Sequence, residues 1–266
     1  MRFTRYYLDL WGFPIYYYGM ILATGILAAF LIGLLLFKMV GYKEEIAYML
    51  LMVCVPIGIL CARFYYIIFY DPVMFGEFFN IRGGGIAIYG GVIGGAIGIF
   101  IVSRIKRVGF FTLADIVVIG VILAQSIGRW GNYVNQEAHG FEVGAHVPPF
   151  TVNIDGRNYL ATFFYESMLN LIGFALMFAY YVYKVRRDKY LWGTTSAFYL
   201  IWYGVTRMFI EPMRTDSLLV FPKLGDAFLL NRVSFVVSFC IVIAGAVLLY
   251  LVKKGKISQE NEACKK

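Results

Sequence analysis

Charged residues are scarce in this chain. Only 15% of its 266 residues are Asp, Glu, Lys or Arg, whereas 61% are hydrophobic, and the mean hydropathy is +0.72. A soluble domain carries about 25% charged residues, most of them on its surface. Because this chain lacks the charge to cover so many apolar side chains, its composition excludes an ordinary soluble protein and predicts a polytopic membrane protein.

Histidine and cysteine are also few. The two histidines, His139 and His146, fall in one loop, which excludes a histidine-ligated metal inside the membrane. The four cysteines have no metal-ligand spacing, and they are Cys54, Cys61, Cys240 and Cys264. We therefore expect no metal site and no disulfide framework. Cys54 and Cys61 could share a helix face, where we expect them to pack as small apolar residues.

Long apolar runs are abundant. About 20 apolar residues span the hydrocarbon core of a bilayer, and seven charge-poor runs of about that length occur, at 14–37, 46–70, 85–103, 112–130, 162–183, 191–211 and 233–252. The first run is too long for the core of a signal peptide and has no clear cleavage site, so we expect it to be retained. We predict an all-α fold of seven transmembrane helices, forming a single integral membrane domain over residues 1–266.

The basic residues predict the orientation of these spans. Of the 24 Lys and Arg residues, 14 fall in one set of loops, 7 in the other and 3 inside predicted spans. Since basic loops are retained in the cytoplasm, we expect the N-terminus outside and the tail, residues 253–266, in the cytoplasm. The net charge of +8 comes from short clusters beside the spans, which favours anionic lipid headgroups as partners and argues against nucleic acid.

Two extracytoplasmic segments, 131–161 and 212–232, are long enough to hold structure, and we expect neither to be a separate domain. In the first, Asp155-Gly156 separates two alternating stretches, TVNI and RNYL. Because this dipeptide favours a two-residue turn between strands, we predict a small β-hairpin on the outer membrane surface.

A glycine-rich stretch, GGGIAIYGGVIGGAIG, lies at the start of the third predicted span. It lacks the GK[ST] ending of a phosphate-binding loop. Its glycines form two rows with a spacing of four residues, namely Gly90, Gly94 and Gly98, and Gly91 and Gly95. We expect a smooth helix face that another helix approaches closely, preceded by a break at residues 83–85.

Polar residues inside the predicted spans fall in one layer. A charged group at the bilayer centre costs at least about 2.5–3.5 kcal/mol, so each one requires a reason. Counted along the predicted topology, the following side chains lie towards the outer side: Tyr18, Arg63, Tyr89, Arg129, Glu166 and Arg207. We therefore expect a polar site at the level of the outer headgroups.

Arginines gathered in this layer would form an anion site, because guanidinium groups stay charged and bind phosphate or carboxylate oxygens in a fork. Tyr203, Arg207 and Glu211 recur at four-residue intervals on one helix face. Pro212 then ends the helix, so that Arg214 can fold back. In a purely structural alternative, the arginines of the spans snorkel to the interface or pair with acidic residues, namely Glu137, Glu166 and Glu211.

The segment GRWGNYVNQEAHG, residues 128–140, resembles the signature of the bacterial prolipoprotein diacylglyceryl transferases, G-R-x-G-N-F-x-N-x-E-x-x-G. Seven positions match, namely Gly128, Arg129, Gly131, Asn132, Asn135, Glu137 and Gly140. Tyr133 stands where the family usually has Phe. Four further stretches resemble the same family in the same order: YYYGM (16–20), GGGIAIYGGVIGG (83–95), FFYES (163–167) and WYGVTRMFIEPMR (202–214). The resemblance therefore covers most of the chain.

The resemblance implies an enzyme of the bacterial cell membrane that works near the extracytoplasmic leaflet. Such an enzyme transfers the sn-1,2-diacylglyceryl group of phosphatidylglycerol to the lipobox cysteine of a prolipoprotein, forming a thioether and releasing glycerol phosphate. It implies no cofactor, and its partners are membrane lipid and the prolipoprotein signal peptide. Expulsion of the phosphate needs fixed cations, for which Arg129 and Arg207 are the candidates.

The incoming thiol must also lose its proton, since the thiolate is the nucleophile. Many family members carry a histidine before the paired glycines, where this sequence has Tyr89, a form similar to that of Gram-positive members. We expect the arginines to lower the pKa of the thiol and Tyr89 or Glu211 to relay the proton.

The other candidate residues are assigned to binding or support. Besides Arg129, the candidates for substrate binding are Tyr18, Arg63, Asn132, Glu166, Tyr203 and Arg214. The candidates for supporting roles are Gly90, Gly91, Asn135, Glu137 and Gly140. For Arg63 and Glu166, binding and structural roles stay equally open.

Two other classes of protein stay open on the sequence. An anionic-lipid transporter would also place arginines in the membrane, but alternating access needs polar groups near the midplane and usually an internal repeat. This sequence shows polar groups at one level and no convincing repeat. A structural membrane protein would explain the glycine faces and basic loops, but it would tolerate Arg129→Ala and Asn132→Ala.

Overall fold

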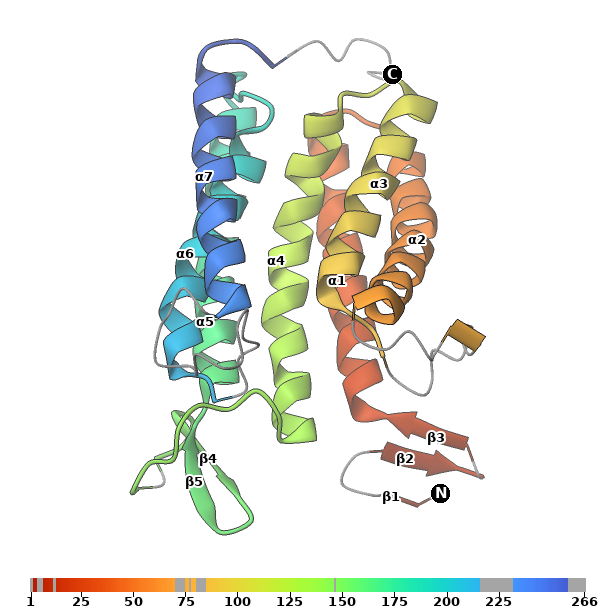
Figure 1. Cartoon of the computed structure of the whole chain (residues 1–266). Helices are drawn as coiled ribbons and strands as arrows, with labels where there is room; N and C mark the ends of the chain where they lie inside the picture. The colour runs from red at the N-terminus through yellow and green to blue at the C-terminus, as the bar shows by residue number, and fades with distance from the viewer. Residues whose placement is uncertain are drawn as a thin grey trace. The chain divides into compact units, whose positions relative to one another are not determined.

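The computed structural model consists of α-helices with two small antiparallel sheets (Figure 1). It describes residues 2–3, 7–11, 13–69, 75–76, 78–79, 85–145, 147–215 and 232–257. The helices are α1 (Tyr17–Met39), α2 (Glu45–Phe69), α3 (Ile88–Lys106), α4 (Phe110–Asn135), α5 (Thr162–Val185), α6 (Thr194–Ile210) and α7 (Val233–Lys253), and a short 3-10 helix, η3 (Glu211–Met213), follows α6. The predictions for His146 and Cys264, for Gly83 and Gly84, and for most of the 212–232 segment fall outside the described residues.

The helices bear out the prediction of a helical, multi-pass membrane protein. In the described part of the chain, six helices are long and apolar enough to cross a membrane, namely α1 to α5 and α7. The helix α6 has 17 residues, which is short for the roughly 20 residues that a bilayer core requires. The count of seven spans and their orientation therefore stay predictions.

Three predicted helix starts are wrong. The first helix begins at Tyr17 rather than at residue 14, because Phe13–Tyr16 forms strand β3 of a three-stranded sheet with β1 (Arg2–Phe3) and β2 (Tyr7–Leu10). An apolar stretch does not by itself distinguish an extended strand from a helix, so this sheet was not predicted. The third helix begins at Ile88 because Gly85, with a φ of +74°, belongs to the expected break. The helix α6 begins at Thr194 rather than at residue 191, because Gly193 before it has a φ of +96°.

The predicted hairpin is present. Strands β4 (Thr151–Ile154) and β5 (Arg157–Leu160) pair antiparallel around Asp155 and Gly156. Both turn residues have positive φ, 49° and 83°, as a turn that matches the twist of the strands requires. The location of the hairpin at the outer membrane surface stays a prediction.

The chain divides into two compact units, one formed by Met1–Ile32 and Val117–Ile257 and the other by Gly33–Ile116 and Ser258–Lys266. The expectation of a single integral domain is not tested by this division. In the second unit, α2 and α3 pack along the row of Gly90, Gly94 and Gly98, as predicted. A Cβ at Gly98 would lie 2.8 Å from the Sγ of Cys54. Gly91 makes looser contacts and Gly95 faces open space, so the second glycine row does not share this packing.

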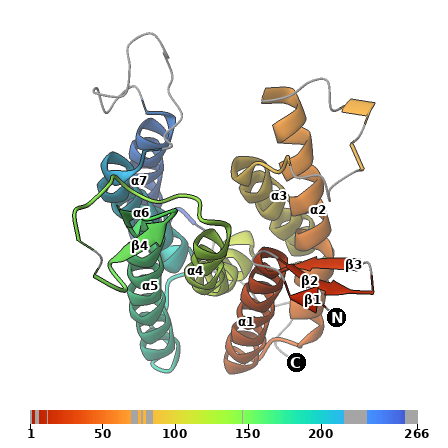
Figure 2. The ribbon, with the colours of Figure 1, turned by 90° about the horizontal axis from the view of Figure 1, so that it is seen from below.

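Close helix contacts also build the first unit, seen end-on in Figure 2. On α4, a Cβ at Gly120 would lie 2.9 Å from the carbonyl oxygen of Ala29 on α1. On α6, a Cβ at Gly204 would lie 2.7 Å from the carbonyl oxygen of Ser238 on α7. Because small residues let the helix backbones approach, the polar groups near the helix ends are brought together.

We predict that Gly94→Ala destabilises the protein by about 1–3 kcal/mol, because the new methyl group overpacks the contact with α2. Its Cβ would lie 2.7 Å from the carbonyl oxygen of Ile57. Gly95→Ala, one residue further along the same helix, is the matched control, since a Cβ there meets nothing within 4 Å. Thermal unfolding of the detergent-solubilised protein measures both. Equal melting temperatures for the two variants would contradict the packing role.

Candidate active site

Glu166, in the second turn of α5, is the centre of a cluster of arginines in the first unit. Its Oε2 lies 2.5 Å from Nη2 of Arg129, and its Oε1 lies 2.8 Å from Nη1 of Arg207 and 3.8 Å from Nη1 of Arg214. These arginines come from the end of α4, the end of α6 and the residue after η3. Three side chains predicted as candidates therefore converge on a fourth.

Arg207 also binds a second carboxylate. Its Nη2 lies 2.8 Å from Oε2 of Glu211, four residues later on the predicted face, and Glu211 is fully buried. The α-helix ends at Ile210 and Pro212 lies within η3, so the prediction that the helix ends here and Arg214 folds back is confirmed. Arg207 is thereby held between two carboxylates, which fixes the orientation of its guanidinium group.

Arg232, just before α7, is a member of the cluster that the sequence reasoning missed. It is buried, and its Nη1 donates to the carbonyl oxygens of Glu211 and Arg214. In the sequence it counts only as one of the outer loop cations. Its one signal is its place directly before an apolar run. The contacts tie the start of α7 to the segment that carries Glu211 and Arg214.

Gly140 lies where the hairpin and the segment after α6 meet beside this cluster. Its N–H donates to the carbonyl oxygen of Leu160 at 2.8 Å, and its backbone forms a bridge with Arg214. A Cβ at this position would lie 2.8 Å from the carbonyl oxygen of Met213. Only glycine therefore fits between β5 and the segment after α6, and the supporting role of Gly140 at the site stays a prediction.

Hydrogen bonds between α4 and α5 hold the residues next to Arg129 and Glu166 in place. The hydroxyl of Ser126 donates to the carbonyl oxygen of Ser167 at 2.8 Å, and the hydroxyl of Ser167 donates to the carbonyl oxygen of Ser126 at 2.9 Å. The indole N–H of Trp130 donates to the hydroxyl of Ser167 at 3.1 Å. Since Trp130 follows Arg129 and Ser167 follows Glu166, these bonds set the spacing of the ion pair.

The polar residues after Arg129 bind one another. The side-chain amides of Asn132 and Asn135 donate to Oε1 of Glu137 at 3.0 Å and 3.3 Å, and the ring of Tyr18 lies against Gly131. Glu137 is exposed. In the part of the chain that the structure describes, Arg129 and Arg207 form ion pairs with the other two acidic residues considered as partners, Glu166 and Glu211. Glu137 instead orders the end of α4.

Ion pairing and anion binding are compatible in this cluster. Within the described residues, Arg129 contacts a single carboxylate, through one of its guanidinium nitrogens. A guanidinium group has five N–H donors, so Arg129 keeps donors for an incoming anion while Glu166 holds it in place. Three guanidinium groups around one carboxylate also concentrate positive charge in a largely water-excluded site, where phosphate oxygens are bound strongly.

The candidate Tyr203 lines a small polar cavity beside the central ion pair. The buried Asn170 also lines it, and this residue was not among the candidates from the sequence. Glu166 and Arg207 also line it. The candidates Tyr18, Arg129, Asn132, Glu166, Tyr203, Arg207, Glu211 and Arg214 thus all belong to one end of the first unit.

The supporting candidates Asn135, Glu137 and Gly140 also belong to the first unit, whereas Arg63, Tyr89, Gly90 and Gly91 belong to the second. Arg63 is fully buried, and its Nε and Nη1 donate to the carbonyl oxygens of Phe78 and Gly85 at 3.2 Å and 3.1 Å. These bonds hold the connection between α2 and α3, a structural role. The ring centroid of Tyr89 lies 6.1 Å from that of Tyr65. The parts of Arg63 and Tyr89 in binding or chemistry stay predictions.

Comparison with known proteins gives a consistent result. A family model described as prolipoprotein diacylglyceryl transferase matches residues 5–251. A protein of Clostridioides difficile (strain 630), named phosphatidylglycerol–prolipoprotein diacylglyceryl transferase, is 38% identical over 257 residues, or 94% of this chain and 97% of that protein. A protein of the same name from Bacillus cereus (strain Q1) is 37% identical over 273 residues, or 98% of this chain and 96% of that protein. The matched range contains the whole cluster around Glu166.

We predict that Glu166→Gln lowers the free energy of unfolding by about 3–5 kcal/mol, because it leaves partly buried arginines without their shared, buried carboxylate. Inorganic phosphate should restore part of this stability by binding the freed guanidinium groups. Glu137→Gln, which removes an exposed carboxylate, should cost much less and gain nothing from phosphate. Melting temperatures with and without phosphate measure both effects. A Glu166→Gln protein as stable as the wild type would show that the cluster is not held by this carboxylate.

Proposed function

Because the chain belongs to the prolipoprotein diacylglyceryl transferase family, we propose that it transfers the diacylglyceryl group of phosphatidylglycerol to a prolipoprotein, the first step of bacterial lipoprotein maturation. The acceptor is the thiol of the lipobox cysteine. The sulfur attacks a glycerol carbon and forms a thioether, the bond between that carbon and the phosphate oxygen breaks, and glycerol phosphate leaves.

The observation that carries this proposal is the convergence of Arg129 and Arg207 on Glu166. In this displacement, negative charge grows on the departing phosphate. Preorganised cations stabilise such a transition state without having to reorganise. Held by carboxylates at fixed positions, Arg129 and Arg207 would bind the phosphate as it leaves, and Arg214, which also reaches Glu166, would bind it on entry.

The acceptor thiol must transfer its proton to another group. A free cysteine thiol has a pKa of about 8.5, and neighbouring cations lower it. We assign that effect to the same arginines, with Tyr89 or Glu211 as the proton relay. Glu211 lies within the cluster, bound to Arg207. The reaction uses groups of the chain and of the two substrates, and we assign it no cofactor.

We further propose that α6 and η3 together form a seventh span, since Thr194–Ile210 is followed directly by Glu211–Met213. The N-terminus would lie outside and the C-terminus in the cytoplasm. The arginine cluster would then lie at the extracytoplasmic leaflet of the cell membrane, where both a phospholipid headgroup and an exported signal peptide are accessible.

We predict that Arg129→Ala lowers the rate of transfer by about 100- to 1,000-fold, as expected when a preorganised donor to a developing oxyanion is lost. The assay measures labelled thioether formed from phosphatidylglycerol and a synthetic lipobox peptide by the purified, folded protein. Arg157→Ala is the control, because Arg157 is an exposed arginine of the hairpin, 3.7 Å from the carboxylate of Glu142.

Absence of product from the wild type, with active lipid and peptide, would contradict the proposed reaction and favour an anionic-lipid transporter. Unchanged transfer by Arg129→Ala would remove this arginine from the chemistry. It would favour a structural role for the cluster.

We predict that Tyr89→Phe lowers turnover and shifts its dependence on pH, because the phenol oxygen would no longer relay the proton. The rate of thioether formation measured across pH, with both substrates saturating, tests this expectation. The same curve for both proteins would exclude Tyr89 from proton transfer. It would leave Glu211 as the candidate relay.

A further inference from the structure

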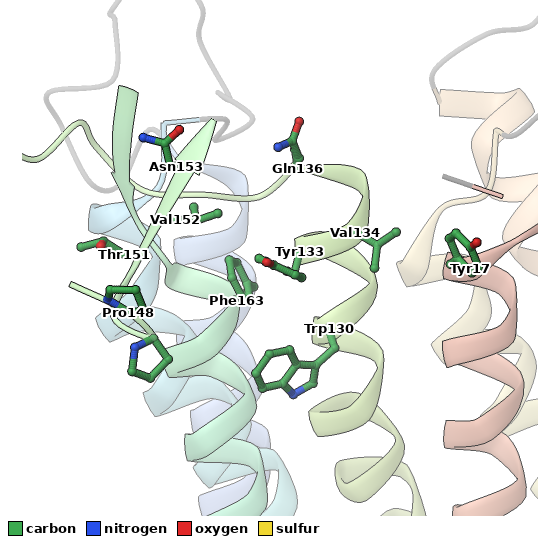
Figure 3. Close-up of a pocket in the computed structure, with 11 residues that line it drawn as sticks. Tyr17, Trp130, Tyr133, Val134, Gln136, Pro148, Thr151, Val152, Asn153 and Phe163 are labelled. Atoms are coloured by element: carbon green, nitrogen blue, oxygen red, sulfur yellow. The ribbon is translucent and has the colours of Figure 1, made fainter. Parts of the chain in front are cut away.

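A cavity of about 550 Å³ opens on the first unit beside the arginine cluster. Its lining comes from the start of α1, the end of α4, the start of α5, the cis-proline turn before β4 and β4 itself. Four aromatic side chains line it, namely Tyr17, Trp130, Tyr133 and Phe163. Figure 3 shows the last three near the strand that carries Val152 and Asn153. This volume is in the range of ligand-binding pockets.

The aromatic lining is not a closed core. Ring centroids of Tyr133 and Phe163 lie 5.5 Å apart, and those of Trp130 and Phe163 lie 6.2 Å apart. Yet Trp130 is 40% exposed and Tyr133 is 51% exposed. Large aromatic side chains that keep this much accessible surface inside a cavity favour an apolar occupant.

The outer edge of strand β4 is open at Asn153, which lines this cavity. At the other outward-facing residue of β4, Thr151, the N–H donates to the carbonyl oxygen of Val147. The N–H of Ala161 donates to the carbonyl oxygen of Phe150, so these two residues form a hydrogen-bonded pair in the ladder. Hydrogen-bonded pairs alternate with non-hydrogen-bonded pairs along an antiparallel ladder. In the register of β4 and β5, Asn153 pairs with Asn158, which is a non-hydrogen-bonded position. The backbone N–H and C=O of Asn153 therefore point away from β5.

These two backbone groups are available for a further strand. No residue that the structure describes binds the backbone N–H or C=O of Asn153. The opposite edge of the hairpin is covered, since Leu160 exchanges hydrogen bonds with the backbone of Gly140 and Phe141. An acyl chain fills an apolar cavity but has no group to bind a sheet edge. An extended peptide does both, with side chains in the cavity and its backbone on the strand.

The cavity adjoins the arginine cluster along α4 and α5, because both helices carry residues of the cavity lining and residues of the cluster. Trp130 follows Arg129 on α4, and Phe163 lies one helical turn before Glu166 on α5. Trp130 is in addition hydrogen-bonded to Ser167, the neighbour of Glu166. A peptide seated on β4 would therefore bring the residues next to its apolar segment towards the bound phosphate.

We propose that the β4 edge and its aromatic cavity bind the acceptor, an extended segment of the prolipoprotein beside its cysteine. The segment adds to β4 as a strand, opposite Asn153, and places an apolar side chain among Trp130, Tyr133 and Phe163. The identity of the acceptor rests on the proposed function. The site itself, a strand-addition site for an apolar extended peptide, rests on the geometry of the first unit.

A comparison of two substitutions at one position tests the sheet edge. Asn153→Pro removes the outward N–H and keeps the β4–β5 ladder, because proline is tolerated where the N–H points away from the sheet. Asn153→Ala keeps the N–H but loses the same side-chain bonds to Asn158 and Gly156. We expect Asn153→Pro to bind a fluorescent lipobox peptide about three- to tenfold more weakly than Asn153→Ala, the loss expected for one neutral hydrogen bond.

Turnover by the same variants shows whether the site binds the acceptor peptide or the donor lipid. With phosphatidylglycerol saturating, the KM for the peptide should be about three- to tenfold higher for Asn153→Pro than for Asn153→Ala. With the peptide saturating, the KM for phosphatidylglycerol should be the same for the two variants. Equal peptide affinity in the two variants would overturn the docking proposal. A difference confined to the KM for the lipid would also overturn it, because the cavity would then belong to the donor.

Backbone methylation of the peptide provides a test that uses only the wild-type protein. If the peptide adds to β4, methylating the nitrogen of the one residue opposite Asn153 should weaken binding, while methylation of its two neighbours should not. A scan without such a position would overturn strand addition. Peptide binding is read by fluorescence anisotropy, without turnover. A protein that binds the peptide in this pattern but forms no thioether would thus keep the site and contradict the proposed function.

Discussion

The structure of the first unit depends on one buried carboxylate. Glu166 forms ion pairs with Arg129 and Arg207, and its Oε1 lies 3.8 Å from Nη1 of Arg214. In the low dielectric of a membrane protein, such arginines cannot be brought together without an anion between them. Glu166 therefore permits the positive charge to gather, and it leaves donors of Arg129 for a phosphate. The same contacts serve stability and the proposed chemistry.

Close packing of helices makes this arrangement possible. Gly120 and Gly204 let α4 approach α1 and let α6 approach α7. Hydrogen bonds between Ser126 and Ser167 then hold α4 against α5, three residues before Arg129 and one residue after Glu166. Because lipid gives no hydrophobic drive for helices to associate, small residues and polar contacts of this kind carry the association.

Close packing at a glycine also shapes the proposed acceptor site in the loops. Gly140 fits between β5 and the segment after α6, which covers one edge of the hairpin, while the β4 edge is open at Asn153. An open edge is normally a risk for aggregation. Placed beside a cavity lined by aromatic side chains, it is instead suited to hold a peptide in one register, next to the cations that would bind the leaving phosphate.

The sequence by itself determined the helices, the Asp155-Gly156 hairpin and most candidate residues, because hydropathy, turn preference and scarce intramembrane charge are local properties of the chain. It did not separate the strand Phe13–Tyr16 from the helix that follows, since both are apolar. The tertiary structure decided which carboxylate each arginine meets, and it brought in Arg232, which the sequence marks only as a loop cation. Such pairings join residues far apart in the chain, so only the packing of the helices fixes them.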